Sequence, residues 1–464
     1  MIWRSREGFV VSDYKNSDLA KRSYSRIMAS GLLDQNIPSE TFVKALHITL
    51  HHILDDNEKA AVDIKSTLRE HRSWTDDQRW FFSQSVFGTA LFRRRLRYLC
   101  GVHASQPNAL LAGYWSDVIG VELTHLRAVF PSSLTEDELH QQRESLGLLP
   151  NALERLAITH SYPNWLVEMW CAQRGLSSTE RLLESMNRPG PVSVRANIAE
   201  CTPDALIALL TQEGINAKRG DYSPWAVQLL QRSNIWGSKA WQRGLFEVQD
   251  EGSQMIVDAL GIKPSSICLD YCAGLGGKTL AMAALLGAGG RLIAADICAD
   301  KLKALRGRLK KARVPPGLVD TMVVPEDEHH MWHNNDFDRI LVDAPCSSLG
   351  TLRRGPDTRW HISERETQAY PALQLEILKN ASRRAAPGAR LLYATCTLNQ
   401  CENQDVVDRF LASENEIWMP VPMGHSYAAL QGATDSSSLR PFELEIDPSS
   451  GSTDGFYMAL FQRR

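Results

Sequence analysis

Two cysteines each follow a short apolar segment, at the point where a β-strand is expected to end. Cys346 follows "ILVDAP" and Cys396 follows "LLYAT", within "RLLYATCTLNQCENQ". Such a cysteine is core filler, a metal ligand, half of a disulfide or a nucleophile. Ligands of a doubly wound α/β sheet bind beyond the carboxyl ends of its strands, so both thiols and Asp343 are expected at one active edge. Their coincidence favours catalytic cysteines.

The cysteine pattern argues against a metal site and against disulfides. The chain has nine cysteines among 464 residues, an odd number at low density. Its N-terminal segment lacks an apolar stretch long enough for a signal peptide, and no stretch is long enough to span a membrane. We therefore expect a cytoplasmic location and reduced thiols. The close pairs Cys268 with Cys272 and Cys396 with Cys401 lack the spacing of a zinc site, so no metal is expected.

A glycine loop, "LDYCAGLGGKT" from Leu269 to Thr279, lies between an expected strand and an expected helix. Its glycines allow the backbone to approach a ligand closely. Asp270 ends the first strand, and Asp296 ends the next one, where an acid can bind the hydroxyls of a ribose. The loop has neither Walker A spacing nor the G-x-G-x-x-G pattern. The combination predicts a nucleoside-containing cofactor and leaves its identity open.

The elements that must position these residues form three regions. Residues 1–150 place apolar side chains at helical spacing, with Ser39 and Thr75 as expected helix N-caps. Residues 151–240 predict a small α/β domain, with strands near 192–196 and in "WAVQLL". From 241 to 464, strands alternate with helices, which is typical of a parallel sheet. The strands of this last region are expected within 265–274, 290–297, 321–326, 337–346, 389–396 and 454–462, and the helices within 278–287, 299–313 and 374–388.

The net charge of −3 means that nucleic-acid binding would need a local basic patch. Three groups of residues are candidates for contacts with RNA, each with the alternative of a merely solvated surface. They are Arg93, Arg94, Arg95 and Arg97; Arg195 and Asn197; and Arg353, Arg354, Arg359 and Trp360.

Four motifs together resemble the RNA 5-methylcytosine methyltransferases of the Sun (RsmB) and Nop2 group. They are "CAGLGGKT", "LVDAPCSSLGTLRR" with "DTRW", "YATCTLNQCEN" and "TDGFYMAL". The resemblance covers about residues 150–464, and "QRWFFSQSVFGTALFRRRLRYL" is similar to the NusB-like helical domain of the Sun branch. It implies a Rossmann-like S-adenosylmethionine methyltransferase domain at 241–464, preceded by a small α/β domain and an all-helical NusB-like domain.

The resemblance also implies a role for each site residue. Cys396 is the nucleophile that adds to carbon 6 of cytosine, and Cys346 promotes release as the base or as part of a proton relay. Asp343 hydrogen-bonds the cytosine edge, and Lys278 adds positive charge that favours a thiolate. The implied cofactor-binding residues are Asp270, Cys272, Ala273, Gly274, Leu275, Gly276, Gly277, Lys278, Asp296 and Asp343, with either Asp327 or Asp320 at the adenine.

Two departures from the family's motifs are visible. Gly274-Leu275 replaces the commoner Ala-Pro, which keeps the loop open. Ser348 stands where a glycine is usual, and a positive φ there would cost about 1 kcal/mol. Neither change touches a reacting group.

These motifs predict a monomeric enzyme that methylates carbon 5 of a cytosine in RNA, with small-subunit ribosomal RNA as the expected substrate. The alternatives are the same chemistry on transfer RNA, a non-catalytic RNA-binding assembly factor on a methyltransferase scaffold, and a nicotinamide dehydrogenase. Both cysteines are present, which disfavours the assembly factor, and a dehydrogenase has no use for paired thiols.

Overall fold

The computed structural model describes residues 15, 17–33, 38–56, 59–231, 233–324, 337–355, 357–423, 439–451 and 453–464. The chain forms two compact units. The first comprises residues 1–188 and 352–364, and the second comprises 189–351 and 365–464. The packing therefore groups residues 151–188 with the helical region that precedes them, whereas the sequence suggested a boundary at 150.

The first unit is built from helices. Ser39 and Thr75 are N-caps, as expected: Ser39 accepts from the Phe42 amide, and Thr75 forms a capping box with Gln78. The elements are α1 (Asp18–Ser30), α2 (Glu40–Leu54), α3 (Ala60–Glu70), α4 (Asp76–Leu91), α5 (Arg93–Leu99), η2 (Gly101–His103), α6 (Pro107–Gly113), η3 (Tyr114–Ile119), α7 (Leu123–Leu126), α8 (Glu136–Gly147), α9 (Ala152–His160), α10 (Asn164–Arg174), α11 (Leu176–Met186) and, from the 352–364 segment, α17 (Thr358–His361).

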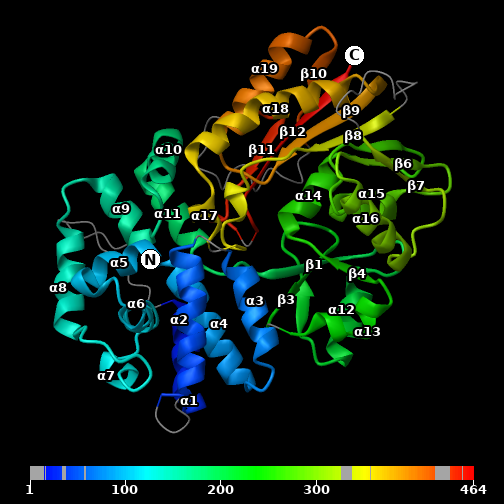
Figure 1. Ribbon diagram of the computed structural model, residues 1–464. Helices are drawn as coiled ribbons and strands as arrows, with labels where there is room; N and C mark the ends of the chain where they lie inside the picture. Colours follow the sequence, from blue (N-terminus) through cyan, green and yellow to red (C-terminus); the bar gives the residue numbers. More distant parts are fainter. Residues whose placement is uncertain are drawn as a thin grey trace. The chain divides into compact units, whose positions relative to one another are not determined.

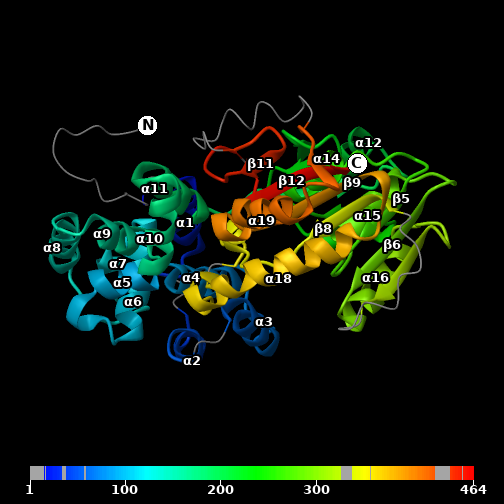
Figure 2. The same ribbon diagram turned by 90° about the horizontal axis from the view of Figure 1, so that it is seen from above.

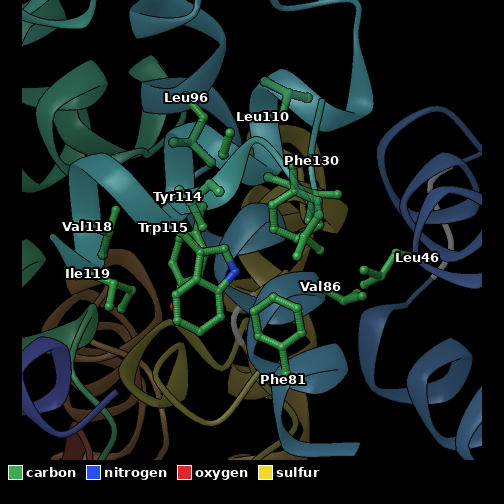
Figure 3. Packing of buried hydrophobic residues seen from close by; sticks show 14 of the residues in the cluster. Leu46, Phe81, Val86, Leu96, Leu110, Tyr114, Trp115, Val118, Ile119 and Phe130 are labelled. Carbon is green, nitrogen blue, oxygen red and sulfur yellow. The ribbon is translucent and has the colours of Figure 1, made fainter. Parts of the chain in front are cut away.

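Trp115 lies in the core of this helical unit and is fully buried. Figure 3 shows its indole beside Tyr114 and near Phe81, and the ring centroids of Phe81 and Trp115 are 4.9 Å apart. The indole N–H donates to Ser85 Oγ at 2.9 Å, so the buried donor is satisfied. Aromatic burial of this kind is a large part of what stabilises the unit.

The second unit contains a small antiparallel sheet with strand order β2-β3-β1-β4. Its apolar side chains pack against α12, where Leu206 and Leu210 contribute to the same buried cluster as Val194 and Val227. The strands predicted near 192–196 and in "WAVQLL" are confirmed. The elements are β1 (Val192–Ala196), α12 (Pro203–Gln212), β2 (Ala217–Arg219), β3 (Ala226–Leu229), η4 (Ile235–Gly237), α13 (Lys239–Gln242) and β4 (Phe246–Val248).

The large sheet of the second unit has the order β10-β12-β9-β8-β5-β6-β7, with β11 paired to β12. Five neighbouring strands are parallel: β9, β8, β5, β6 and β7. Strand β12 pairs antiparallel with β9, and β10 and β11 each pair antiparallel with β12. The elements are α14 (Glu251–Ala259), β5 (Ile267–Asp270), α15 (Gly277–Leu285), β6 (Arg291–Asp296), α16 (Ala299–Lys311), β7 (Val319–Val323), β8 (Phe337–Asp343), η6 (Leu349–Thr351), α18 (Glu364–Ser382), β9 (Ala385–Thr395), η7 (Gln400–Glu402), α19 (Gln404–Glu414), β10 (Trp418–Pro420), β11 (Glu443–Ile446) and β12 (Phe456–Arg463).

The chain runs outward from β5 to β7 on one side, then returns to build β8 and β9 on the other. The order therefore reverses between β5 and β8, where open α/β sheets bind ligands. Asp270 ends β5 and Asp343 ends β8 at this switch point. The predicted Rossmann-like architecture is confirmed.

Alternate residues of the strands pack on opposite faces of the large sheet. Ile340 and Val342 belong to the cluster built with α18 and α19, whereas Leu341 belongs to the cluster built with α14 and α15. Figures 1 and 2 both show α18 and α19 side by side along the sheet. This burial on both faces fixes the register, and with it the positions of the loops that follow the strands.

Within the ranges given above, no helix is both long and apolar enough to cross a lipid bilayer. The same ranges contain no group of three or more His, Cys, Asp or Glu side chains placed to hold a metal ion.

Candidate active site

The two predicted cysteines meet at the carboxyl edge of the sheet. Strands β8 and β9 are parallel neighbours, and Asp343 pairs in register with Ala394. Cys346 and Cys396 follow these strand ends, and their Sγ atoms lie 3.3 Å apart. This distance suits a hydrogen bond between a thiol and a thiolate, and both thiols are free of disulfides.

The two thiols are electrostatically unequal. The hydrogen bond from Cys346 lowers the pKa of Cys396, with further lowering by Ser348 and Lys278, against burial and Asp343, which raise it. The same hydrogen bond raises the pKa of Cys346 well above its ordinary value, together with burial and the charges of Cys396 and Glu402. Cys396 is therefore the more readily ionised thiol of the pair, and Cys346 is the one that more readily keeps its proton.

Ser348 has a left-handed backbone, with φ of 57°. The concern raised by a serine at this position is thus justified, because non-glycine residues adopt this φ at a cost. Its hydroxyl lies 3.4 Å from Cys396 Sγ. The hydroxyl that replaces the usual glycine therefore acts on the electrostatics of the thiolate.

Gly350 and Gly455 bring the late "TDGFYMAL" motif to the cysteines. A Cβ on Gly350 would lie 2.2 Å from Gly455 O and 2.8 Å from Cys396 O, so only glycine fits. The Gly350 amide donates to Cys396 O at 2.9 Å, and the Gly455 amide donates to Gly350 O at 2.8 Å. Hydrogen bonds therefore join the segments of Gly350, Cys396 and Gly455, which are far apart in the sequence.

Lys278 and Asp343 form a short ion pair beside the cysteines. Lys278 Nζ lies 2.6 Å from Asp343 Oδ2, and the lysine side chain is mostly buried. Burial alone would lower the pKa of Lys278, but Asp343, Cys396 and Asp270 outweigh it and raise the pKa. The lysine therefore stays charged and places a fixed cation where it lowers the pKa of Cys396.

The glycine loop has a backbone that can approach a ligand. Gly274 has φ of 55° with nothing within 4 Å of an added Cβ, and Gly276 has φ of 81°. The carboxylate of Asp296 accepts from the amides of Gly274 and Cys298, both at 2.8 Å. The acid thus fixes the loop at the end of β6.

Asp270, at the start of this loop, has one carboxylate oxygen that is buried and unsatisfied among the described residues. Its Oδ2 accepts from Thr279 Oγ1 at 2.6 Å, while its buried Oδ1 has no hydrogen-bond partner within the described part of the chain. Burial raises the pKa of Asp270 to about 7. A buried, unsatisfied acceptor at a topological switch point fits a cofactor that brings its own donors, such as an ammonium or hydroxyl groups.

The remaining residues of the predicted cofactor site divide into two groups. Cys272, Ala273, Leu275 and Gly277 are in the loop or at the start of α15, and the Leu275 side chain is 56% exposed. Asp327 lies outside the described residues. Asp320 is excluded as the adenine contact, because it lies in the first half of β7 and is paired with Arg291, at the start of β6, 3.0 Å away.

The prediction that Arg359 and Trp360 contact RNA is wrong. Arg359 is fully buried, donates to Asn187 Oδ1 at 2.7 Å and lies 3.6 Å from the centre of the Tyr162 ring. Trp360 donates its indole N–H to Ala90 O at 3.1 Å. These side chains fasten the 352–364 segment inside the helical unit.

The arginine cluster of α5 is also mainly structural. Arg95 is buried and paired with Asp117 at 2.6 Å, and Arg94 donates to Asn164 Oδ1 at 2.7 Å. Of the four arginines, Arg97 is the exposed one: its side chain has 48% of its surface accessible to solvent. The prediction of a phosphate-binding cluster is therefore wrong for Arg94 and Arg95.

Arg195 and Asn197 are likewise not surface residues for RNA. Arg195 is buried and donates to Gly277 O at 2.7 Å, at the start of α15. Asn197 donates to Gly244 O at 3.1 Å and to Ala312 O at 2.9 Å. Both residues hydrogen-bond the small sheet to backbone oxygens of segments that come later in the sequence. These bonds explain why polar side chains stand at the two positions.

One buried residue of the site, Glu402, was missed from the sequence. Its side chain is fully buried and accepts from the Ser347 amide at 2.9 Å, directly after Cys346. The available signal was the polar run at 399–403 after the Thr-Cys strand, for which the sequence predicted no catalytic role.

Comparison with protein-family models places most of the second unit and part of the first in one family. Residues 257–462 match the model described as 16S rRNA methyltransferase RsmB/F, and residues 162–236 match its ferredoxin-like domain. The second match covers β1, β2 and β3 of the small sheet and the helices just before them, and it ends before β4. The motif-based resemblance is thereby confirmed.

Curated relatives agree. The chain is 29% identical over 430 residues to a probable ribosomal RNA small subunit methyltransferase B of Bacillus subtilis (strain 168), covering 86% of this chain and 94% of that protein. It is 30% identical over 322 residues to ribosomal RNA small subunit methyltransferase B of Pseudomonas putida, covering 68% and 70% respectively.

Solved structures share the fold. The crystal structure of PH0851 superposes with a TM-score of 0.70 at 24% identity, covering 90% of this chain and 98% of that one. A methyltransferase homolog protein from Pyrococcus horikoshii gives a TM-score of 0.58 at 23% identity, covering 68% and 100%. The sequence matches establish that the chain belongs to the RsmB/F family of 16S rRNA methyltransferases, whose cofactor is S-adenosylmethionine.

Proposed function

We propose that the chain methylates carbon 5 of a cytosine in small-subunit ribosomal RNA, through a covalent bond between Cys396 and carbon 6 of the base. The observation that carries this proposal is the cysteine pair: two thiols 3.3 Å apart, of which Cys396 has the lowered pKa and Cys346 the raised one. The names of the relatives support ribosomal RNA over transfer RNA.

Carbon 5 of cytosine is a poor nucleophile until a thiolate adds to the ring. In the proposed first step, Cys396 Sγ forms a bond to carbon 6, and the ring double bonds shift so that carbons 4 and 5 become doubly bonded. Ring nitrogen 3 takes up a proton from solvent in this step and returns it to solvent when the ring is released. Asp343 hydrogen-bonds this edge of the ring, and its pairing with Lys278 holds it in place. The base must leave its helix or loop to reach this pocket.

S-adenosylmethionine supplies the methyl group that carbon 5 then takes. In the last step, the proton on carbon 5 leaves to a base, the 5,6 double bond reforms, and the bond from carbon 6 to sulfur breaks. Cys396 is thereby regenerated as a thiolate. Cys346 lies next to it and promotes this release, as the base or as part of a proton relay.

Asp270, Asp296 and the glycine loop are the proposed cofactor-binding residues. The loop backbone and the unsatisfied Asp270 Oδ1 fit a group that carries hydroxyls and an ammonium. Cys272, Ala273, Leu275 and Gly277 line the same turn and complete the proposed set.

A denaturing gel tests the mechanism. Wild type, Cys346→Ala and Cys396→Ala are incubated with S-adenosylmethionine and either small-subunit ribosomal RNA or a transfer RNA pool. We expect a covalent protein–RNA band only in Cys346→Ala with ribosomal RNA, because methylation proceeds but release is blocked. A band in Cys396→Ala would reverse the two roles, and a band with transfer RNA would change the substrate. No band and no methyl transfer with either RNA would favour a non-catalytic assembly factor.

A further inference from the structure

Glu402 lies between the two cysteine loops and takes no part in the chemistry described above. We propose that it is a positioning residue of this site: it ties the loop of Cys346 to the loop of Cys396, and its negative charge keeps Cys346 in the thiol form. This inference rests on the proposed function, because it assumes that the two cysteines need different protonation states.

The contacts of Glu402 join the two loops directly. Its Oε2 accepts from the Ser347 amide at 2.9 Å, and its Oε1 accepts from the Ser347 hydroxyl. Oε1 also accepts from Asn399 Nδ2 at 3.1 Å, in the loop that follows Cys396. One side chain thus binds the residue after Cys346 and a residue three positions after Cys396.

Helix α18 and strand β9 complete the environment of this carboxylate. Gln374 Nε2 donates to Glu402 Oε2 at 3.0 Å and also to Pro345 O at 3.0 Å, directly before Cys346. The hydroxyl of Tyr393, on β9, donates to the backbone oxygen of Glu402 at 2.6 Å. Both neighbours of Cys346 in the sequence, Pro345 and Ser347, are therefore held by the same network.

The side chain of Glu402 accepts from four donors, which is a donor set that suits a carboxylate. Ser347 provides an amide and a hydroxyl, while Gln374 and Asn399 provide one amide N–H each. A protonated carboxyl group would need one of these partners to become an acceptor. A buried carboxylate without a cation among these partners is retained at a cost, which points to a purpose for its charge.

The groups that act electrostatically on Cys346 come from several elements. They are Cys396 at the end of β9, Glu402 on η7, Tyr370 on α18 and Tyr393 on β9. Among these four groups, the carboxylate of Glu402 and the ionised form of Cys396 are the charges that raise the pKa of Cys346. The cation Lys278 and its partner Asp343 act on Cys396 instead. When Cys396 is bound to cytosine it loses its charge, and Glu402 is then the remaining anion next to Cys346.

Alkylation of the full-length protein without RNA tests this inference. The rate at which iodoacetamide modifies Cys346 is followed against pH by mass spectrometry of its peptide. In Glu402→Gln we expect the midpoint for Cys346 to fall by about one pH unit, because a nearby anion is removed from a buried site. Asp405→Asn is the matched control, since it removes the same charge from a side chain that contacts Gln400 rather than the Cys346 loop. Its profile is expected to match wild type.

Superimposable profiles for Glu402→Gln and wild type would overturn the charge argument. Glu402→Asp provides a second test, because it keeps the charge but shortens the reach to Ser347. We expect a lower melting temperature with a nearly unchanged midpoint, and a midpoint that falls as in Glu402→Gln would also contradict the proposal. The readout needs no methyl transfer. A shifted midpoint in a protein that methylates no RNA would therefore refute the proposed function alone.

Discussion

The Sγ atoms of Cys346 and Cys396 lie 3.3 Å apart, and the pKa values of the two thiols are shifted in opposite directions, although both are partly exposed at the same sheet edge. Burial by itself raises the pKa of both thiols. The difference arises first from their mutual hydrogen bond, which lowers the pKa of Cys396 and raises that of Cys346. Ser348 and Lys278 lower the pKa of Cys396 further, whereas the charge of Glu402 raises that of Cys346 further. Two chemically identical side chains are thus differentiated by the loops that carry them.

Cys396 is expected to be the more reactive thiol near neutral pH. Its alkylation by iodoacetamide should reach half its maximal rate at a lower pH than that of Cys346, because only the thiolate reacts. Peptide mass spectrometry across a pH series measures both rates in one sample. In Cys346→Ala the midpoint for Cys396 should rise, since the hydrogen bond that lowers its pKa is lost. Equal midpoints for the two thiols in wild type would contradict the assignment of the nucleophile.

Ser348→Gly should increase stability and decrease thiol reactivity. Glycine relieves the left-handed φ of 57°, which adds about 1 kcal/mol to the free energy of unfolding. The same change removes the hydroxyl 3.4 Å from Cys396 Sγ, so the alkylation midpoint of Cys396 should rise. Arg313→Gly is the matched control, because Arg313 has φ of 58° and does not contact the cysteines. Urea denaturation and alkylation together distinguish strain relief from a loss of thiolate stabilisation.

Asp270→Asn should stabilise the protein without cofactor and weaken cofactor binding. Burial raises the pKa of Asp270 from 3.8 to about 7, so the folded chain binds a proton that the unfolded chain has released. The stability due to this group is complete below about pH 4 and is lost as the pH rises through about 7. At pH 8 the variant should therefore unfold with a free energy about 2–4 kcal/mol higher than wild type. The difference should vanish near pH 4.

Urea denaturation at pH 4 and pH 8, with and without S-adenosylmethionine, measures both effects. The cofactor should stabilise wild type at pH 8 more than the variant, because the stability added by a ligand rises with the logarithm of its affinity for the folded state. If the cofactor stabilised both proteins equally, Asp270 would not be one of its ligands. If the variant were less stable at pH 8, the carboxylate would have a stabilising partner that the geometry does not reveal.

The sheet and its active edge could be predicted from the sequence because both depend on local patterns. Apolar runs of strand length end in Asp270, Asp296, Asp343 and Cys396, and the parallel topology brings such ends together. The short antiparallel strands β2, β4, β10 and β11 were not predicted. They have three or four residues each, too few for a periodic signal.

The roles of individual polar residues were harder to predict, because they depend on partners far away in the sequence. Arginines such as Arg359 and Arg195 are typical of RNA-binding surfaces, so both were candidates for contacts with RNA. Both are buried and donate to carbonyl or amide oxygens of other segments. Glu402 stands in a polar run for which the sequence predicted no role. In each case the charged group is buried and bonds to other parts of the chain. Burial depends on the tertiary structure, so the local sequence pattern does not predict it.

Arg359→Ala should destabilise the helical unit, because this arginine is fully buried among its residues. The substitution removes the bond to Asn187 Oδ1 at 2.7 Å and the stacking on Tyr162, and it leaves a cavity. We expect a loss of about 2–4 kcal/mol in the free energy of unfolding of that unit. Arg359→Lys should recover little, because a lysine cannot reproduce the planar guanidinium on the ring. Arg354→Ala, in an exposed position of the same segment, is the control and should change stability by less than about 0.5 kcal/mol.

Arg359→Ala also shows whether the 352–364 segment restrains the loop of Cys346, to which it is joined along the chain. This segment begins directly after η6, a few residues past Cys346 and Ser348, yet it packs in the helical unit. Loosening it should therefore free the loop of Cys346, which would appear as faster alkylation of that thiol at pH 8 in Arg359→Ala than in Arg354→Ala. Unchanged alkylation, together with the expected loss of stability, would mean that the hydrogen bonds of Glu402 and Gly350 hold the catalytic loop without help from the helical unit.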